Sequence, residues 1–92
     1  MAANSTETVD TTNYEKFQTG NPVVKRLIGG FYDTVEEVVK PLKPATVLDA
    51  GCGEGETLDR LSEVLPPAPT GIDLNPESVE FAARRLPGAT IR

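Results

Sequence analysis

The sequence predicts an α/β fold built on a doubly wound parallel sheet, with only the first strands and helices present. Short apolar runs alternate with helical patterns of about ten residues, which is the pattern of βαβ units. The first of these runs, residues 46–50, shows no alternation of apolar and polar side chains, as expected for a strand covered on both faces. A glycine-rich turn follows that run and leads straight into a helical pattern. Ligands of open α/β sheets bind at such strand ends.

The chain divides into three predicted parts. Residues 1–12 are polar and lack periodicity, so we expect a disordered tail. Residues 13–43 form a leading helical segment, in which Tyr14 and Phe17 can share one helical turn packed on the body. Residues 44–92 form a βαβα(β) unit, the incomplete half of a larger sheet domain.

The main helix of the leading segment begins at Asn21-Pro22, an N-cap residue followed by proline at the first helical position. Pro41 and Pro44 end it, since a residue before proline avoids the helical region. The glycine pair at 29–30 implies either a close neighbour or a bend. The apolar residues of the helix recur every three or four positions and predict one packing stripe: Val24, Leu27, Ile28, Phe31, Val35, Val38 and Leu42.

The βαβα(β) unit is predicted to hold strands at 46–50 and 70–74, a third beginning at 89, and helices at 56–65 and from 76. Because the first strand of a doubly wound sheet is central, half of its hydrogen-bonding edge would stand open here. We therefore expect either that the chain is the front part of a longer protein or that a partner chain or dimer covers this edge.

Composition excludes several function classes. Nine lysines and arginines against 14 aspartates and glutamates give a net charge of −5, which disfavours nucleic-acid binding by this segment. The single cysteine excludes an internal disulfide, and no apolar run is long enough to span a bilayer. Histidine is absent, which removes the commonest general base and metal ligand. We expect a soluble cytoplasmic protein with no membrane association, and we assign it no catalytic residue and no metal site.

The glycine turn separates two classes of nucleotide cofactor. Its glycines are Gly51, Gly53 and Gly55, and Glu56 stands where the dinucleotide fingerprint G-x-G-x-x-G requires its third glycine. The turn and the first helical positions also carry four acids opposed only by Arg60: Asp49, Glu54, Glu56 and Asp59. These carboxylates would repel a pyrophosphate and favour a cationic ligand such as S-adenosylmethionine (SAM), which has a sulfonium and an ammonium group and no phosphate.

A second acid ends the next predicted strand. An ionised Asp73 at that point can accept hydrogen bonds from both hydroxyls of an adenosine ribose, and Leu74 beside it can lie against the adenine. NAD enzymes place an acid similarly, so Asp73 by itself indicates a nucleoside without saying which one.

At these residues the chain resembles the class I SAM-dependent methyltransferases, which have a Rossmann-like fold. The segment VLDAGCGEG at 47–55 looks like their first motif, and GIDLN at 71–75 looks like the acidic motif that follows it. The resemblance covers residues 44–92. It implies that the backbone of the glycine turn approaches the methionine part of SAM. It also implies that Asp49 lies near the amino end of the cofactor and that Asp73 holds the ribose. The expected cofactor-binding residues are Asp49, Ala50, Gly51, Cys52, Gly53, Gly55, Asp73 and Leu74.

The resemblance implies methyl transfer from SAM to an unidentified acceptor, with the chain inactive without a C-terminal part. Two alternatives stay open: a SAM- or nucleoside-binding fragment without turnover, and half of an NAD-binding oxidoreductase domain. Cys52 is expected to be a small turn residue and not a nucleophile, since no basic neighbour lowers its pKa. The leading helix is expected to pack on the body, with a lid over SAM as the other interpretation.

Overall fold

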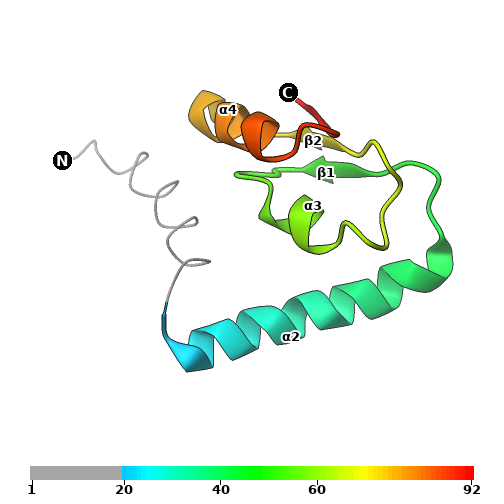
Figure 1. Ribbon diagram of the computed structural model, residues 1–92, viewed down its shortest axis with the longest axis vertical. Coiled ribbons are helices and arrows are strands. Elements are labelled where there is room, and N and C mark those ends of the chain that lie inside the picture. The colour runs from blue at the N-terminus through cyan, green and yellow to red at the C-terminus, as the bar shows by residue number, and fades with distance from the viewer. Residues whose placement is uncertain (1–19) are drawn as a thin grey trace.

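The computed structural model describes residues 20–92 (Figure 1). The predicted tail at 1–12 and the helical turn with Tyr14 and Phe17 lie outside the described residues. The elements, in chain order, are α2 (Pro22–Val39), the 3-10 helix η1 (Lys40–Leu42), β1 (Leu48–Ala50), α3 (Glu56–Arg60), β2 (Thr70–Ile72), α4 (Pro76–Arg85) and β3 (Thr90–Ile91). This order confirms the predicted alternation of strands and helices.

The three strands form one parallel sheet in the order β1-β2-β3. Asp49 of β1 lies opposite Gly71 of β2, which in turn lies opposite Ile91 of β3. The hydrogen-bond ladder begins before the named strand, because the Thr70 N–H donates to the Val47 carbonyl at 3.1 Å. Within residues 20–92, β1 has a neighbouring strand on one side only.

Helix α2 begins as the sequence predicts, with the Asn21 side chain accepting from the N–H groups of Val23 at 2.9 Å and Val24 at 3.3 Å. The predicted packing stripe is only partly covered, however. Several of its members are largely exposed, among them Leu27 at 69%, Phe31 at 61% and Val38 at 62%. The helix is continuous through the glycine pair at 29–30, and a Cβ added at either glycine would meet nothing within 4 Å.

The buried residue of α2 is Tyr32, which lies outside the predicted stripe. Its hydroxyl is hydrogen-bonded to Thr57 Oγ1 of α3 at 2.9 Å, and the Arg60 guanidinium lies 5.0 Å from its ring centroid. Figure 1 shows α3 lying between α2 and β1. Tyr32 therefore packs α2 against α3 through a hydrogen bond and a cation–π contact. The spacing of apolar residues along the sequence reveals neither contact.

Helix α3 is shorter than predicted, ending at Arg60 instead of Leu65. Beyond it the chain forms tighter turns, with Ser62 N–H donating to the Asp59 carbonyl at 3.2 Å and Val64 N–H donating to the Leu61 carbonyl at 2.9 Å. The chain leaves the helix at Leu61, whose φ of −96° and ψ of 11° lie outside the helical region. The proline pair at 66–67 would in any case stop a helix at Leu65, because a proline supplies no N–H donor and pushes the preceding residue out of the helical region.

Helix α4 begins at Asn75, whose side chain accepts from Ser78 N–H at 2.9 Å, and Pro76 follows at the first helical position. Within the described part of the chain, the buried apolar residues are Tyr32, Cys52, Leu58, Leu61 and Ala82. This small core joins the glycine turn, α3 and α4. None of the described helices is long and apolar enough to cross a membrane.

Candidate functional site

The carboxyl ends of β1 and β2 lie side by side and carry the two predicted acids. Asp49 lies within β1, and Asp73 directly follows β2. The glycine turn leaves β1 between them, because the N–H groups of Gly51 and Cys52 both donate to the Ile72 carbonyl, at 2.7 and 2.9 Å. The parallel pairing therefore brings together two motifs that are separated in the sequence by α3 and a loop.

Four N–H donors of the turn are used within the protein. Besides Gly51 and Cys52, Gly53 N–H donates to Asp73 Oδ2 at 2.8 Å and Gly55 N–H donates to the Cys52 carbonyl at 2.9 Å. A phosphate-binding glycine loop works by presenting free N–H groups to the anion. These four donors are directed instead to a strand carbonyl, a carboxylate and the turn itself.

The three glycines of the turn serve different purposes. All have positive φ, +78° at Gly51, +55° at Gly53 and +88° at Gly55, a region that other residues adopt at a cost. A Cβ added at Gly51 or Gly53 would meet nothing within 4 Å, so open space lies beside both. A Cβ at Gly55 would lie 2.8 Å from Leu86 Cδ1, so Gly55 is required for packing on α4.

Asp73 accepts hydrogen bonds from the backbone and retains acceptor positions for a ligand. Its Oδ2 accepts from Gly53 N–H and its Oδ1 accepts from Asn75 N–H at 2.9 Å. A carboxylate has about four acceptor positions, so each oxygen of Asp73 keeps one for a ligand hydroxyl. The same residue can therefore order the glycine turn and bind a ribose.

Asp49 is a half-buried carboxylate with an unfavourable charge environment. Burial raises the pKa of Asp49, and the negative charge of Asp73 raises this pKa further. Among the described residues, neither aspartate has a lysine or arginine within ion-pair distance. A ligand that brings positive charge to this point would relieve the repulsion.

Two of the four acids assigned to the turn from the sequence are paired with arginines, which corrects the prediction that only Arg60 opposes them. Glu56 forms ion pairs with Arg60 and with Arg85, the latter at 2.7 Å, and Asp59 pairs with Arg85 at 2.9 Å. Burial alone would raise the pKa of Glu56, but hydrogen bonds and charges from Arg60 and Arg85 outweigh burial and lower this pKa. Among the described residues, the negative charges near the turn that lack an arginine or lysine partner are therefore those of Asp49, Asp73 and Glu54, whose carboxylate accepts only from Ser78 Oγ.

Cys52 is a buried packing residue. Burial raises the pKa of its thiol, and the charges of Asp49, Asp73 and Glu54 raise the pKa further, so the thiol stays protonated. A Cβ at Gly71 would lie 2.9 Å from Cys52 Sγ. Gly71 therefore lets the glycine turn pack onto β2. This role was not predicted from the sequence, although a glycine inside a short strand is a signal of close packing.

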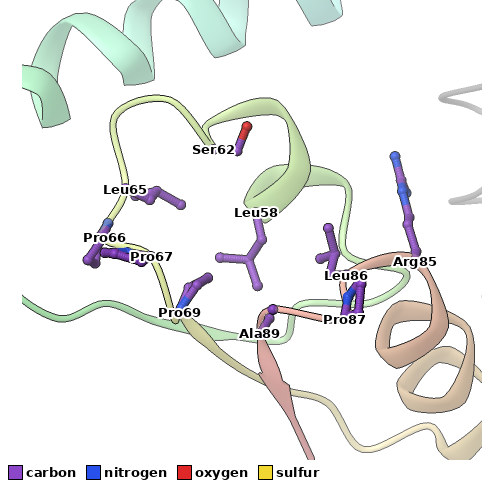
Figure 2. Close-up of a pocket in the computed structure, with 11 residues that line it drawn as sticks. Leu58, Ser62, Leu65, Pro66, Pro67, Pro69, Arg85, Leu86, Pro87 and Ala89 are labelled. Carbon is purple, nitrogen blue, oxygen red and sulfur yellow. The ribbon is translucent and has the colours of Figure 1, made fainter.

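Two further predicted site residues are open to solvent at the same sheet edge. Ala50 is exposed at the end of β1, and Leu74 is fully exposed beside Asp73. A separate apolar cavity of about 250 Å³ lies elsewhere, among Leu58, Leu86 and the prolines of the 66–69 loop (Figure 2). None of the predicted cofactor-binding residues lines this cavity.

Comparison with known proteins places the chain in a family. Residues 42–88 match the methyltransferase domain family, and the chain belongs to it. A search of curated protein sequences found no match.

Solved structures share the fold. An amino pentose methyltransferase from Micromonospora echinaspora, CalS10, with SAM bound, is 26% identical with a TM-score of 0.61, over 90% of this chain and 33% of its own. The methyltransferase domain of a bacterial protein, CtHen1-C, is 27% identical with a TM-score of 0.54, over 66% of this chain and 37% of its own. A TehB-like SAM-dependent methyltransferase from Corynebacterium glutamicum shares the fold at 24% identity and a TM-score of 0.52, over 78% and 45%. The chain thus spans less than half the length of each.

Proposed function

We propose that this chain is the cofactor-binding part of a SAM-dependent methyltransferase that transfers a methyl group to an acceptor. Membership of the methyltransferase domain family and the likeness to the SAM-bound CalS10 support this function. The observation that carries the proposal is the pair of carboxylates, Asp49 and Asp73, at adjacent strand ends without a cationic partner among the described residues. They flank a glycine turn in which the N–H groups of Gly51, Cys52, Gly53 and Gly55 are already used.

The residues of the site fit SAM. The ammonium group would interact with Asp49, relieving the repulsion that raises the pKa of this carboxylate. The ribose hydroxyls would donate to the remaining acceptor positions of Asp73. Gly51 and Gly53 leave open space in which the methionine part can lie against the backbone, with Ala50 and Cys52 flanking it. Leu74 offers an exposed apolar side chain for the adenine. Gly55 would support cofactor binding without touching the cofactor, because it lets the glycine turn pack on α4.

The chemistry asks little of these side chains. Bound SAM supplies a methyl group on a positively charged sulfur, which an acceptor displaces in line. The contribution of this chain is to bind and orient the donor, which lowers the barrier by fixing the geometry of attack. The raised pKa of Cys52 keeps its thiol protonated, so it does not compete as a nucleophile.

The alternative of an NAD-binding half is disfavoured by the same geometry. A pyrophosphate at the turn would face Asp49 and Asp73 and would find the N–H groups of Gly51, Cys52 and Gly53 engaged. A cytoplasmic location, and the lack of nucleic-acid binding by this segment, stay predictions from composition. A partner chain at the free edge of β1 also stays a prediction.

The test is a calorimetric titration of the full chain with two related ligands. SAM carries an ammonium group, whereas 5′-methylthioadenosine keeps the ribose and adenine and lacks it. Asp49→Asn is expected to weaken SAM binding by about 10- to 100-fold and to leave 5′-methylthioadenosine binding nearly unchanged. Glu80→Gln is the matched control, because Glu80 is exposed and pairs only with Arg84 among the described residues.

Equal loss of both ligands in Asp49→Asn, or no SAM binding by the unaltered chain, would contradict the proposal. Binding of SAM without methyl transfer to any acceptor in a cell extract would favour the non-catalytic alternative.

A further inference from the structure

Arg85, in the last turn of α4, contacts the glycine turn and α3 at three acceptors. Its guanidinium donates to the Glu54 carbonyl at 3.3 Å, to Glu56 Oε1 at 2.7 Å and to Asp59 Oδ2 at 2.9 Å. The Arg85 and Glu56 side chains are well covered, at 24% and 11% exposed, whereas Asp59 is 51% exposed. Hydrogen bonds between charged groups that are shielded from water are stronger than those at an open surface.

The rest of α4 is fastened to the same turn. Near the start of the helix, Ser78 Oγ donates to Glu54 Oε2 at 3.2 Å. In the middle, Gly55 lies so close to Ala82 and Leu86 that an added Cβ would be 3.4 Å from Ala82 Cβ. Asp73, which accepts from Gly53 N–H, precedes the helix by only two residues. Helix α4 therefore contacts Glu54 and Gly55 of the glycine turn, and its start lies close in sequence to Asp73, the residue proposed to bind the ribose.

We propose that Arg85 is a positioning residue for cofactor binding: it fixes residues 54–56, and through them the glycine turn, against α4 and Asp73. This inference rests on the proposed function. A turn held in place before the ligand arrives costs less conformational entropy on binding than one that the ligand must order. Arg85 itself is not assigned a contact with the cofactor, because its guanidinium is engaged by Glu54, Glu56 and Asp59 and lies beyond 4 Å of a Cβ added at Gly51 or Gly53.

An arginine at position 85 suits these three contacts better than a lysine would. Its planar fork donates from one nitrogen to two carboxylates and from a second nitrogen to a carbonyl, whereas lysine presents its three donors from a single nitrogen. Burial would lower the pKa of Arg85, but Glu56 and Asp59 outweigh burial and raise it. The neighbouring Arg84 provides a contrast, since its ion pair with Glu80 at 3.6 Å is largely exposed on both sides.

The experiment compares Arg85→Gln, Arg85→Lys and the control Arg84→Gln in the full chain. SAM affinity is measured by calorimetry at a temperature where each variant is fully folded, and hydrogen exchange is followed at the amides of Gly51, Cys52 and Gly53. Arg85→Gln should weaken SAM binding by about tenfold, Arg85→Lys should be intermediate, and Arg84→Gln should match the unaltered protein. The three turn amides should exchange faster in Arg85→Gln by more than the loss of global stability explains.

The double variant Arg85→Gln/Asp59→Asn removes the carboxylate that Arg85→Gln would leave without an arginine, because Glu56 keeps its pair with Arg60, and it keeps the test available if Arg85→Gln alone fails to fold. The double variant should also bind SAM weakly. Uniform acceleration of exchange across the sheet, with unchanged SAM affinity in the folded variants, would show a merely structural role and overturn the inference. If the unaltered protein binds no SAM, the proposed function fails, while the exchange pattern still decides whether Arg85 orders the turn.

Discussion

Replacing Asp49 by Asn should stabilise the free protein while weakening SAM binding. The substitution keeps the shape of the side chain and removes its charge. In the free protein that charge is unfavourable, because burial and then the charge of Asp73 raise the pKa of Asp49. A raised pKa in an acid means that the folded state binds the proton more tightly than the unfolded chain does. The penalty is therefore present above the raised pKa, and it disappears as the pH falls below the unfolded value of about 3.9.

The size of the effect is modest for folding and larger for binding. One unit of pKa corresponds to about 1.4 kcal/mol, but Asp49 is only half-buried and water screens its charge. We expect Asp49→Asn to raise the free energy of unfolding by about 0.5 kcal/mol at pH 7. A hydrogen bond from the SAM ammonium to a carboxylate is worth about 1.5–3 kcal/mol, which gives the 10- to 100-fold loss of affinity stated above.

The assay pairs denaturant unfolding with calorimetry on the same samples. The unfolding midpoint of Asp49→Asn should rise at pH 7 with an unchanged m-value, and the gain should vanish near pH 3. SAM affinity of the unaltered protein should fall as the pH drops through the raised pKa of Asp49, and this dependence should be absent in Asp49→Asn. A lower midpoint at pH 7, or unchanged SAM affinity, would refute the charge argument.

Three further predictions concern stability. Glu56→Gln should lower the free energy of unfolding by about 2 kcal/mol at pH 7, because it breaks the pairs with Arg60 and Arg85. Since those partners lower the pKa of Glu56, the difference in unfolding midpoint from the unaltered protein should shrink as the pH falls below about 4, and a constant difference would argue against the ion pairs. Gly30→Ala should stabilise α2 by about 0.5–1 kcal/mol in thermal unfolding, as no described residue lies near its added Cβ; destabilisation would reveal an unseen contact. Gly55→Ala should cost about 2 kcal/mol or more in denaturant unfolding, through its φ of +88° and the Leu86 side chain, and a neutral effect would mean that α4 shifts freely.

Local signals in the sequence predicted most of the architecture. The Asn-Pro pairs gave both helix starts because capping depends on neighbouring residues only, and the structure confirms them at α2 and α4. The end of α3 was predicted five residues too late, because apolar periodicity continues through a segment that folds as tight turns.

Features that depend on distant contacts could not be predicted. Arg85 lies in the last turn of α4, where any basic residue is favoured by the helix dipole, and its partners Glu56 and Asp59 belong to α3, 29 and 26 positions earlier in the chain. The charge argument for the turn therefore counted acids that Arg85 neutralises. The docking of α2 through Tyr32 was missed for the same reason, since the hydroxyl partner Thr57 lies on α3. Proximity of Asp49 and Asp73, by contrast, follows from parallel strand order and was predictable.

A competition titration tests most directly whether this glycine turn selects a cationic donor over a phosphorylated one. The full chain is titrated with SAM in the absence and in the presence of a saturating concentration of NADH. The carboxylates of Asp49 and Asp73 and the engaged N–H groups of the turn predict that SAM binds with the same Kd in both titrations. Displacement of SAM by NADH would contradict this account of the site.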